Sequence, residues 1–302
     1  MRIVFLGTPD FAVASLEALV NHNFNVVAVV TAPDKPAGRG MHLQQSAVKQ
    51  YAVLKGIPVL QPEKLKNPAF IEQLKAFKAD IQIVVAFRML PQIVWEMPPL
   101  GTINVHGSLL PQYRGAAPIN WAIINGEKET GVTTFKLQHA IDTGNILLQE
   151  KMAIEPEDTI GTMYNKLKDL GAEALIKTLN QLIDGSLKEQ PQQQIIEDLH
   201  TLHHAPKIFT ETCQIDFNKS VVAIHNLVRG LSPVPGAFTF LQGKKMKIFT
   251  ATPQLIHHNQ AIGSVETDNK TYLKFACIDG YLHCLDIQLE GKKRMLIEDF
   301  LR

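Results

Sequence analysis

The chain begins Met1-Arg-Ile-Val-Phe-Leu-Gly-Thr-Pro-Asp10. Its apolar run from Ile3 to Leu6 has the length of a buried strand, and the residues from Gly7 to Pro9 form a turn signal. After Asp10, apolar residues recur at helical spacing as far as Leu19. The order of a strand, a turn and a helix is typical of the first unit of an α/β sheet.

Further apolar runs continue this pattern. Residues 26–30 and 81–86 are predicted to be buried strands, and 57–60 a shorter one. Segments with helical character lie between them, at about 46–55 and 67–78. Short buried runs that alternate with helices are typical of a parallel sheet covered on both faces. The predicted fold class is therefore α/β, a Rossmann-like, doubly wound and mostly parallel sheet.

The last third of the chain has a different pattern. A long helix is predicted over 159–184, and Pro191 with a run of glutamines begins a linker at 191–205. Beyond residue 206, short alternating runs separated by Gly and Asn predict a small antiparallel barrel. These runs are 214–217, 247–249, 272–277 and 282–287, with a helix expected at 221–231. The chain is thus expected to contain domains at 1–190 and 206–302.

Composition limits the class of protein. The 302 residues are 45% hydrophobic and 20% charged, with a net charge of +1, as in ordinary soluble globular proteins. The first apolar run is too short for a signal peptide, and no run approaches a membrane-spanning length. Cys213, Cys277 and Cys284 lack the spacing of a disulfide framework or a zinc site. We therefore expect a cytoplasmic protein that holds no metal and does not associate with a membrane.

Residues 206–302 carry 12 Lys and Arg against 9 Asp and Glu. This small positive excess is either an ordinary solvated surface or a weak indication of a nucleic-acid-binding face.

A nicotinamide-type oxidoreductase is the first alternative for such a fold. Its fingerprint needs three glycines after the first strand, whereas this chain has only Gly7 there. Pro9 also removes a backbone donor that a pyrophosphate would use. The sequence disfavours this class.

Polar residues gather where another strand ends, in Thr102-Ile-Asn-Val-His-Gly-Ser-Leu-Leu-Pro-Gln-Tyr-Arg-Gly-Ala-Ala-Pro118. The two-residue period of a strand places Asn104 and His106 on one face. A second strand-like stretch, from Gly131, runs into a turn that contains Asp142. These groups either form a site at the sheet edge or merely satisfy backbone groups.

The motifs Asn104-Val-His106, Ser108-Leu-Leu-Pro111 and Asp142-Thr-Gly144 together resemble the folate-dependent formyltransferase family. The resemblance covers nearly the whole chain and is most specific for members whose acceptor is initiator methionyl-tRNA. Other matching motifs are Gly7-Thr-Pro-Asp-Phe-Ala12, Pro33–Gly40, Arg114–Pro118 and Pro233–Ala237.

The resemblance implies direct transfer of a formyl group from 10-formyltetrahydrofolate, a donor substrate, to an amine. Asn104 and His106 would donate hydrogen bonds to the oxyanion, and Asp142 would orient the imidazole and organise a water. No serine nucleophile is implied, because Ser108 lacks a Gly-x-Ser-x-Gly elbow. A nucleotide-amino-sugar N-formyltransferase, a folate hydrolase and a non-enzymatic binding protein remain alternatives.

The resemblance also implies binding residues. The folate would lie against Ser108, Leu109, Leu110 and Pro111, and against Phe87, Arg88, Met89 and Leu90. The family usually has glycine where this chain has Arg88, and Phe87 and Leu90 could instead be plain core.

For the tRNA, the residues implied are Arg39, in an expected loop at 31–43, and Lys244, Lys245 and Lys247 in an OB-like barrel. Members commonly carry lysines where this chain has Met41 and His42. We expect a monomer.

Overall fold

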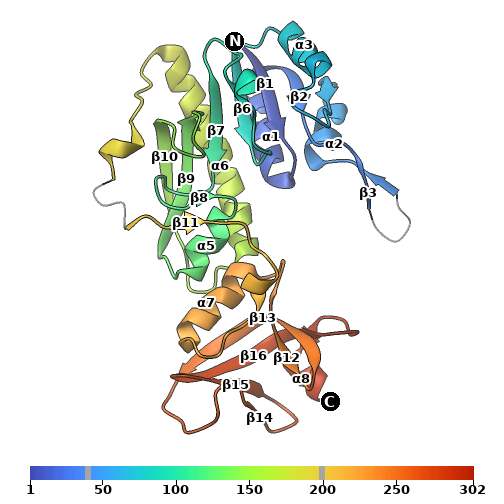
Figure 1. The fold of residues 1–302 in the computed structure, drawn as a ribbon, viewed down its shortest axis with the longest axis vertical. Coiled ribbons are helices and arrows are strands. Elements are labelled where there is room, and N and C mark those ends of the chain that lie inside the picture. The colour runs from blue at the N-terminus through green and yellow to red at the C-terminus, as the bar shows by residue number, and fades with distance from the viewer. Residues whose placement is uncertain (38–41, 197–200) are drawn as a thin grey trace. The chain divides into compact units, whose positions relative to one another are not determined.

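The computed structural model describes residues 1–37, 42–196 and 201–302, which form two compact units (Figure 1). The N-terminal unit comprises residues 1–114, 131–151 and 165–203. The C-terminal unit comprises residues 115–130, 152–164 and 204–302. The assignment of separate functions to 1–190 and 206–302 stays a prediction.

The N-terminal unit is built on a seven-stranded sheet in the order β10-β9-β7-β6-β1-β2-β5. Its strands from β7 to β5 pair in parallel, and β9 pairs antiparallel with β7. The strands are β1 (Arg2–Gly7), β2 (Asn25–Val30), β5 (Val59–Leu60), β6 (Ile81–Val85), β7 (Thr102–His106), β9 (Glu129–Lys136) and β10 (Ile146–Ala153). The predicted Rossmann-like, mostly parallel sheet is confirmed.

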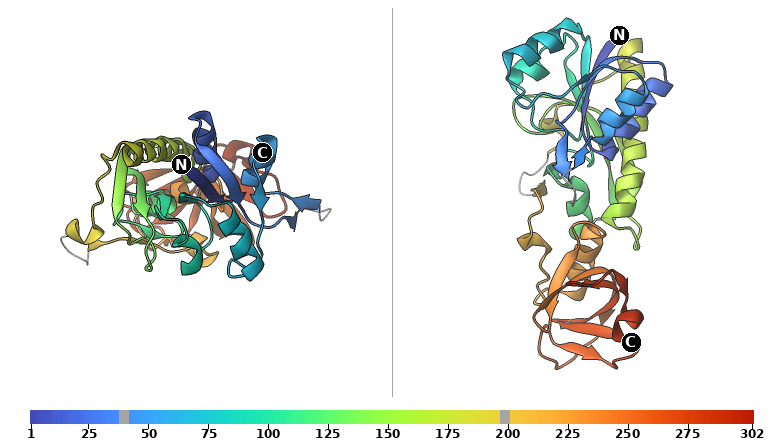
Figure 2. Two further views of the ribbon diagram at one scale, coloured as in Figure 1. Left: turned by 90° about the horizontal axis from the view of Figure 1, so that it is seen from above. Right: turned by 90° about the vertical axis from the view of Figure 1, so that its right-hand side faces the viewer.

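Helices cover both faces of this sheet (Figure 2). On one face lie α1 (Asp10–Asn21) and α6 (Ile160–Asp184), joined by a 2.8 Å bond from Lys168 to Asp10. Gly7 permits the close approach of α1, because a Cβ there would lie 2.7 Å from that of Ala12. On the other face, Leu74 of α3 (Pro68–Ala76) and Val94 of α4 (Gln92–Trp95) pack on Val4.

The expected loop at 31–43 is wrong in detail. Two short strands, β3 (Lys35–Ala37) and β4 (His42–Gln44), pair antiparallel there. Such pairing is decided by a turn and by main-chain hydrogen bonds, which leave little trace in hydrophobic periodicity. Asp34 fixes the base of this hairpin, because it accepts a 2.5 Å bond from Lys49, in α2 (Ala47–Leu54), and a 2.7 Å bond from Gln61.

The C-terminal unit holds a curled antiparallel sheet in the order β12-β13-β16-β15-β14, with β17 beside β16. This open half-barrel confirms the predicted OB-like class. Its strands are β12 (Ala237–Leu241), β13 (Lys244–Leu255), β14 (Val265–Thr267), β15 (Leu273–Cys277), β16 (Gly280–Leu289) and β17 (Met295–Leu296). The strand expected at 214–217 is wrong, because only Gln214 makes a single bridge, to Phe238.

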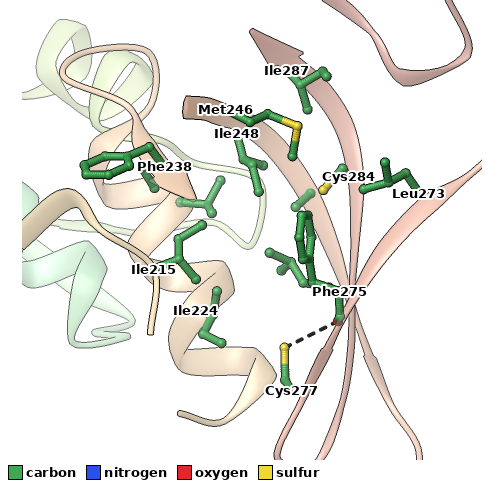
Figure 3. Packing of buried hydrophobic residues seen from close by; sticks show 14 of the residues in the cluster. Ile215, Ile224, Phe238, Met246, Ile248, Leu273, Phe275, Cys277, Cys284 and Ile287 are labelled. Carbon is green, nitrogen blue, oxygen red and sulfur yellow. Dashed lines mark hydrogen bonds between the residues drawn. The ribbon is translucent and has the colours of Figure 1, made fainter. Parts of the chain in front are cut away.

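The helix predicted at 221–231 is α7 (Val221–Leu231), and it fills the concave side of the half-barrel (Figure 3). Ser220 caps its first turn by accepting a bond from the amide of Ala223. Ile224 then packs against Met246 and Ile248 of β13 in one buried cluster. The remaining short elements are β8 (Arg114–Gly115), α5 (Pro118–Ile124), η1 (Gln192–Gln194), β11 (His204–Ala205), η3 (Glu211–Cys213) and α8 (Ile297–Leu301).

Within residues 1–37, 42–196 and 201–302, none of the helices has the length and hydropathy needed to cross a bilayer.

Candidate active site

The polar residues predicted from the sequence meet at the carboxyl end of β7. His106 is the last residue of this strand, and Asn104 lies two residues earlier on the same face. Because β6 and β7 are parallel, the segment after Val85 reaches the same edge of the sheet. The side-chain amide of Asn104 is half-buried and has no hydrogen-bond partner within the described part of the chain. Its donor is therefore available to a ligand.

His106 is held on both sides of its ring. Its Nε2 lies 3.0 Å from the main-chain oxygen of Tyr113. A carbonyl only accepts, so this contact places a hydrogen on Nε2. The other nitrogen, Nδ1, lies 4.0 Å from Oδ2 of Asp142, and both side chains are about nine-tenths buried. Nδ1 is therefore the ring nitrogen that faces the carboxylate.

Asp142 lies in the turn between β9 and β10, in the left-handed region with a φ of 53°. Gly144 gives this turn its shape, because a Cβ there would lie 1.7 Å from the main-chain oxygen of Lys136. The Asp-Thr-Gly motif therefore combines a carboxylate with the one residue type that lets the chain pass β9 so closely.

Two residues that the sequence reasoning missed complete this cluster. Gln192 is fully buried, and its Nε2 donates to the main-chain oxygens of Asp142, at 2.9 Å, and Gly144, at 2.8 Å. Its Oε1 accepts two bonds from Arg114, at 3.1 and 2.6 Å. Burial lowers the pKa of Arg114, and the nearby charge of Asp142 opposes that shift.

The segment from Ser108 to Pro111 is a rigid loop after β7. Ser108 is fully buried and donates to the main-chain oxygen of Gln112 at 2.7 Å. Thr133 supports the loop, because its hydroxyl donates to the Ser108 oxygen at 2.7 Å and accepts from the Leu110 amide at 3.1 Å. Leu110 packs in a small cluster with Phe135 and Ile146. The side chains of Ser108 and Leu110 are thus engaged within the protein.

The four residues predicted after β6 differ in environment. Leu90 is buried in the core beneath α3, whereas Met89 is 73% exposed. Arg88 lies over the ring of Phe87 and donates to the main-chain oxygens of Pro62 and Glu63. It therefore ties the loop after β6 to the loop after β5.

A cavity of about 520 Å³ opens beside this tie, which is the size of a small-ligand site. Its lining comes from the loops after β1, β2, β5 and β6, and consists of Thr8, Ala32, Pro33, Lys35, Glu63, Phe87 and Arg88. Two predicted folate-binding residues and one lysine of the 31–43 segment thus share one wall.

The residues predicted to bind tRNA are only partly described. Arg39 lies outside the described residues. On β13, Lys244 is exposed, while the ammonium of Lys245 lies 3.6 Å from the centre of the Phe238 ring. Lys247 donates to the main-chain oxygen of Pro235 at 2.8 Å. Lys245 and Lys247 therefore have partners in the C-terminal unit, and Lys244 is the most accessible charge of the three.

In the part of the chain that the structure describes, no three His, Cys, Asp or Glu side chains gather in a way that could hold a metal ion. The groups assembled at the end of β7 are an amide, an imidazole, a carboxylate and a guanidinium. Together they can donate to a developing oxyanion and move a proton.

Two family models match the chain. The model described as formyl transferase covers residues 1–179, and the one described as formyl transferase, C-terminal domain, covers residues 207–302. The methionyl-tRNA formyltransferase of Parabacteroides distasonis is 55% identical, over 100% of this chain and 95% of its own length. The corresponding proteins of Bacteroides fragilis and Porphyromonas gingivalis are 50% and 46% identical, again over the whole of this chain.

Solved structures share the fold at lower identity. The crystal structure of WlaRD, a sugar 3N-formyl transferase in the presence of dTDP and 5-N-formyl-THF, has a TM-score of 0.69 and 22% identity. It matches 97% of this chain and 99% of its own. HypX from Aquifex aeolicus in complex with tetrahydrofolic acid has a TM-score of 0.66 and 20% identity, over 100% of this chain and 47% of its own.

Proposed function

The chain belongs to the formyl transferase family, and we propose that it transfers the formyl group of 10-formyltetrahydrofolate to the α-amino group of methionyl-tRNA. The product, N-formylmethionyl-tRNA, serves translation initiation. The observation that carries the proposal is the pairing of His106 with Asp142 beside the free amide of Asn104. Full-length identity of about half to proteins of that activity supports the choice of acceptor.

The reaction is an acyl transfer. The amino nitrogen attacks the formyl carbon, a C–N bond forms, and the carbonyl oxygen becomes an oxyanion. The bond from carbon to N10 of the folate then breaks, the amine loses a proton and N10 gains one. Asn104 and the ring of His106 donate to the oxyanion, and one such donor contributes about 10²–10³ in rate.

Asp142 has two tasks in this scheme. Its carboxylate orients the imidazole of His106, whose Nδ1 lies 4.0 Å from Oδ2. It also holds a water that carries the proton away from the attacking amine. No covalent enzyme intermediate is needed, because the amine is itself the nucleophile.

The folate donor is placed by main-chain groups. We assign it to the loop Ser108–Pro111 and to the segment Phe87–Leu90, which meet at the carboxyl edge of the parallel strands. Because Leu110 and Leu90 are buried, their contribution is through the main chain. Thr133 holds the loop Ser108–Pro111 in place, and this loop keeps the donor in register with Asn104.

The acceptor end of the tRNA is assigned to the cavity at the loops after β1, β2, β5 and β6. Lys35 lies four residues before Arg39 in the sequence and lines the 520 Å³ cavity with Phe87 and Arg88. The ammonium of Lys35 suits a phosphate of the terminal nucleotide that carries the methionine. Lys244, Lys245 and Lys247 are assigned to phosphates of the tRNA body. The chain is further proposed to act as a cytoplasmic monomer.

An acceptor assay tests the function. The purified chain is given 10-formyltetrahydrofolate with initiator methionyl-tRNA or with an amino-sugar nucleotide, and formyl product is measured for each. Product with the tRNA alone supports the proposal. Product with the sugar alone, formate release without any acceptor, or no turnover would each point to one of the alternative classes.

A further inference from the structure

A glutamine in the segment after α6 connects directly to the site. We propose that Gln192 is a positioning residue, which ties the turn of Asp142 to Arg114 and so sets the carboxylate against His106. This inference rests on the proposed function, because it assigns a task to a residue around the same carboxylate. Gln192 touches neither substrate in this scheme and acts only through Asp142 and Arg114.

The amide of Gln192 uses its complete hydrogen-bonding capacity. Both hydrogens of Nε2 go to carbonyl oxygens, of Asp142 and Gly144, and both lone pairs of Oε1 accept from Arg114. Carbonyls cannot donate and guanidinium cannot accept, so a rotation of the amide by 180° would break all four bonds. The side chain is therefore locked in one orientation.

The segment that carries Gln192 is itself anchored to the sheet. Gln190 exchanges two main-chain bonds with Ile146 at the start of β10, at 2.9 and 2.8 Å. Glu189 accepts from Lys136 at 2.9 Å and from Asn145 at 3.0 Å. The segment that carries Gln192 is thus fixed to the sheet, so the side-chain amide of Gln192 can restrain the Asp142 turn.

The restraint matters because the turn is not held by regular structure alone. Asp142 has a positive φ, a strained conformation that a non-glycine residue keeps only where the surrounding structure holds it. Gln192 bonds the carbonyl of this same residue. Through its other end it also holds the positive charge of Arg114 near the carboxylate. One amide therefore fixes both the place and the electrostatic partner of Asp142.

Two variants of the full chain test the proposal in the methionyl-tRNA assay. Gln192→Met keeps the length of the side chain and removes all four bonds. Gln192→Glu keeps acceptance from Arg114 but cannot donate to the two carbonyls. The matched control is Gln193→Met, because Gln193 is exposed on the next position of the same segment.

We expect both Gln192 variants to lower kcat by about 10- to 100-fold, with KM for folate and tRNA within about threefold of the wild type. The profile of kcat against pH should change in both, because the charge of Arg114 is no longer held in place near Asp142. Gln193→Met should leave kcat and the profile unchanged. Thermal unfolding is measured for every variant, and active-site titration gives the fraction of each preparation that is active.

The proposal is overturned if Gln192→Met keeps wild-type kcat. It is also overturned if the losses in both variants follow the folded fraction while the pH profile stays in place, since that is the result of a purely structural role. If Gln192→Met does not fold, Gln192→Glu alone decides by the same criteria. A wild-type chain that formylates no methionyl-tRNA would instead refute the proposed function, so the two failures are distinguishable.

Discussion

Nε2 of His106 lies 3.0 Å from the main-chain oxygen of Tyr113, seven residues along the chain. Tyr113 is itself fixed by His203. Its amide donates to the main-chain oxygen of His203 at 2.7 Å, and its hydroxyl lies 3.1 Å from Nδ1 of the same residue. The imidazole is therefore oriented by a main-chain group, which a side-chain substitution does not remove. This leaves Nδ1 as the nitrogen that faces Asp142.

The first prediction concerns Asn104, His106 and Asp142. Replacing any one of them by alanine should lower kcat by roughly 10²-fold or more, because each removes a transition-state donor or the group that manages the proton. Steady-state formylation kinetics check this, with thermal unfolding as the control for folding. Full activity of Asn104→Ala or His106→Ala would contradict the assignment of the active site.

Some of this site could be predicted from the sequence because strand periodicity is local. The alternation of Ile103 and Val105 with Asn104 and His106 fixes which pair shares a face, and the structure confirms that strand. The approach of Asp142 could not come from spacing, since it depends on β9 turning back beside β7. The resemblance to the formyltransferase family was the basis for predicting that Asp142 joins the site.

Gln192 could not be recognised for a different physical reason. A glutamine beside a proline and two further glutamines has the composition of a solvated linker. Its burial arises from docking of this segment on β10, a contact between residues more than forty positions apart. No local pattern records such a contact. For Arg114, the sequence indicates a role in the site only weakly, through a single charge within a glycine- and proline-rich loop.

A second prediction concerns Gly144. The Cβ of Gly144→Ala would overlap the main-chain oxygen of Lys136, and a backbone atom cannot move aside as a flexible side chain does. The variant should lose about 1–3 kcal/mol of unfolding free energy and also lose activity, because the Asp142 turn must shift. Denaturant unfolding measures the first effect. Thr143→Ala, in the same turn, is the control and should cost less than about 1 kcal/mol.

A third prediction concerns Arg88, whose bonds to the main-chain oxygens of Pro62 and Glu63 join two loops without taking part in the reaction. Arg88→Ala frees the loop at Pro62 and Glu63, so the wall of the cavity should loosen. We expect KM for the substrates to rise by about 3- to 10-fold with kcat nearly unchanged, because no reacting group is touched. Initial rates at varied folate and tRNA concentrations give both constants. Ile93→Ala, at an exposed position of α4 outside the assigned folate segment, should behave as wild type, and an equal effect in both variants would argue against the tie.

The fourth prediction concerns the thiols of the C-terminal unit. Burial raises the pKa of Cys277 to about 11, and burial also raises the pKa of Cys284 and of Cys213. At pH 8 only about 0.1% of Cys277 is then thiolate, the form that reacts. Native protein should therefore react very slowly with a thiol reagent, and all three cysteines should react after unfolding in urea. Rapid native labelling of any of them would show that the half-barrel core opens readily.

The last prediction tests the lysines of β13. Each phosphate contact releases counterions, so the logarithm of tRNA affinity should fall with the logarithm of salt concentration by roughly 0.7 to 0.9 per contact. Replacing Lys244, Lys245 and Lys247 together by glutamine should weaken tRNA binding and flatten this slope by up to about 2 to 3, with folate binding unchanged. Lys244 should contribute most, because Lys245 and Lys247 already have partners at Phe238 and Pro235.

The control for this test removes the same charge elsewhere, by replacing Lys64, Lys66 and Lys75 of the N-terminal unit with glutamine. If net charge alone governed binding, both triple variants would lose the same affinity. If the lysines of β13 contact phosphates, only their replacement lowers the slope. An unchanged slope in the β13 variant, measured between about 50 and 200 mM salt, would mean that the tRNA is held by other residues. The lysines of β13 would then be part of an ordinary solvated surface, with Lys245 and Lys247 engaged at Phe238 and Pro235.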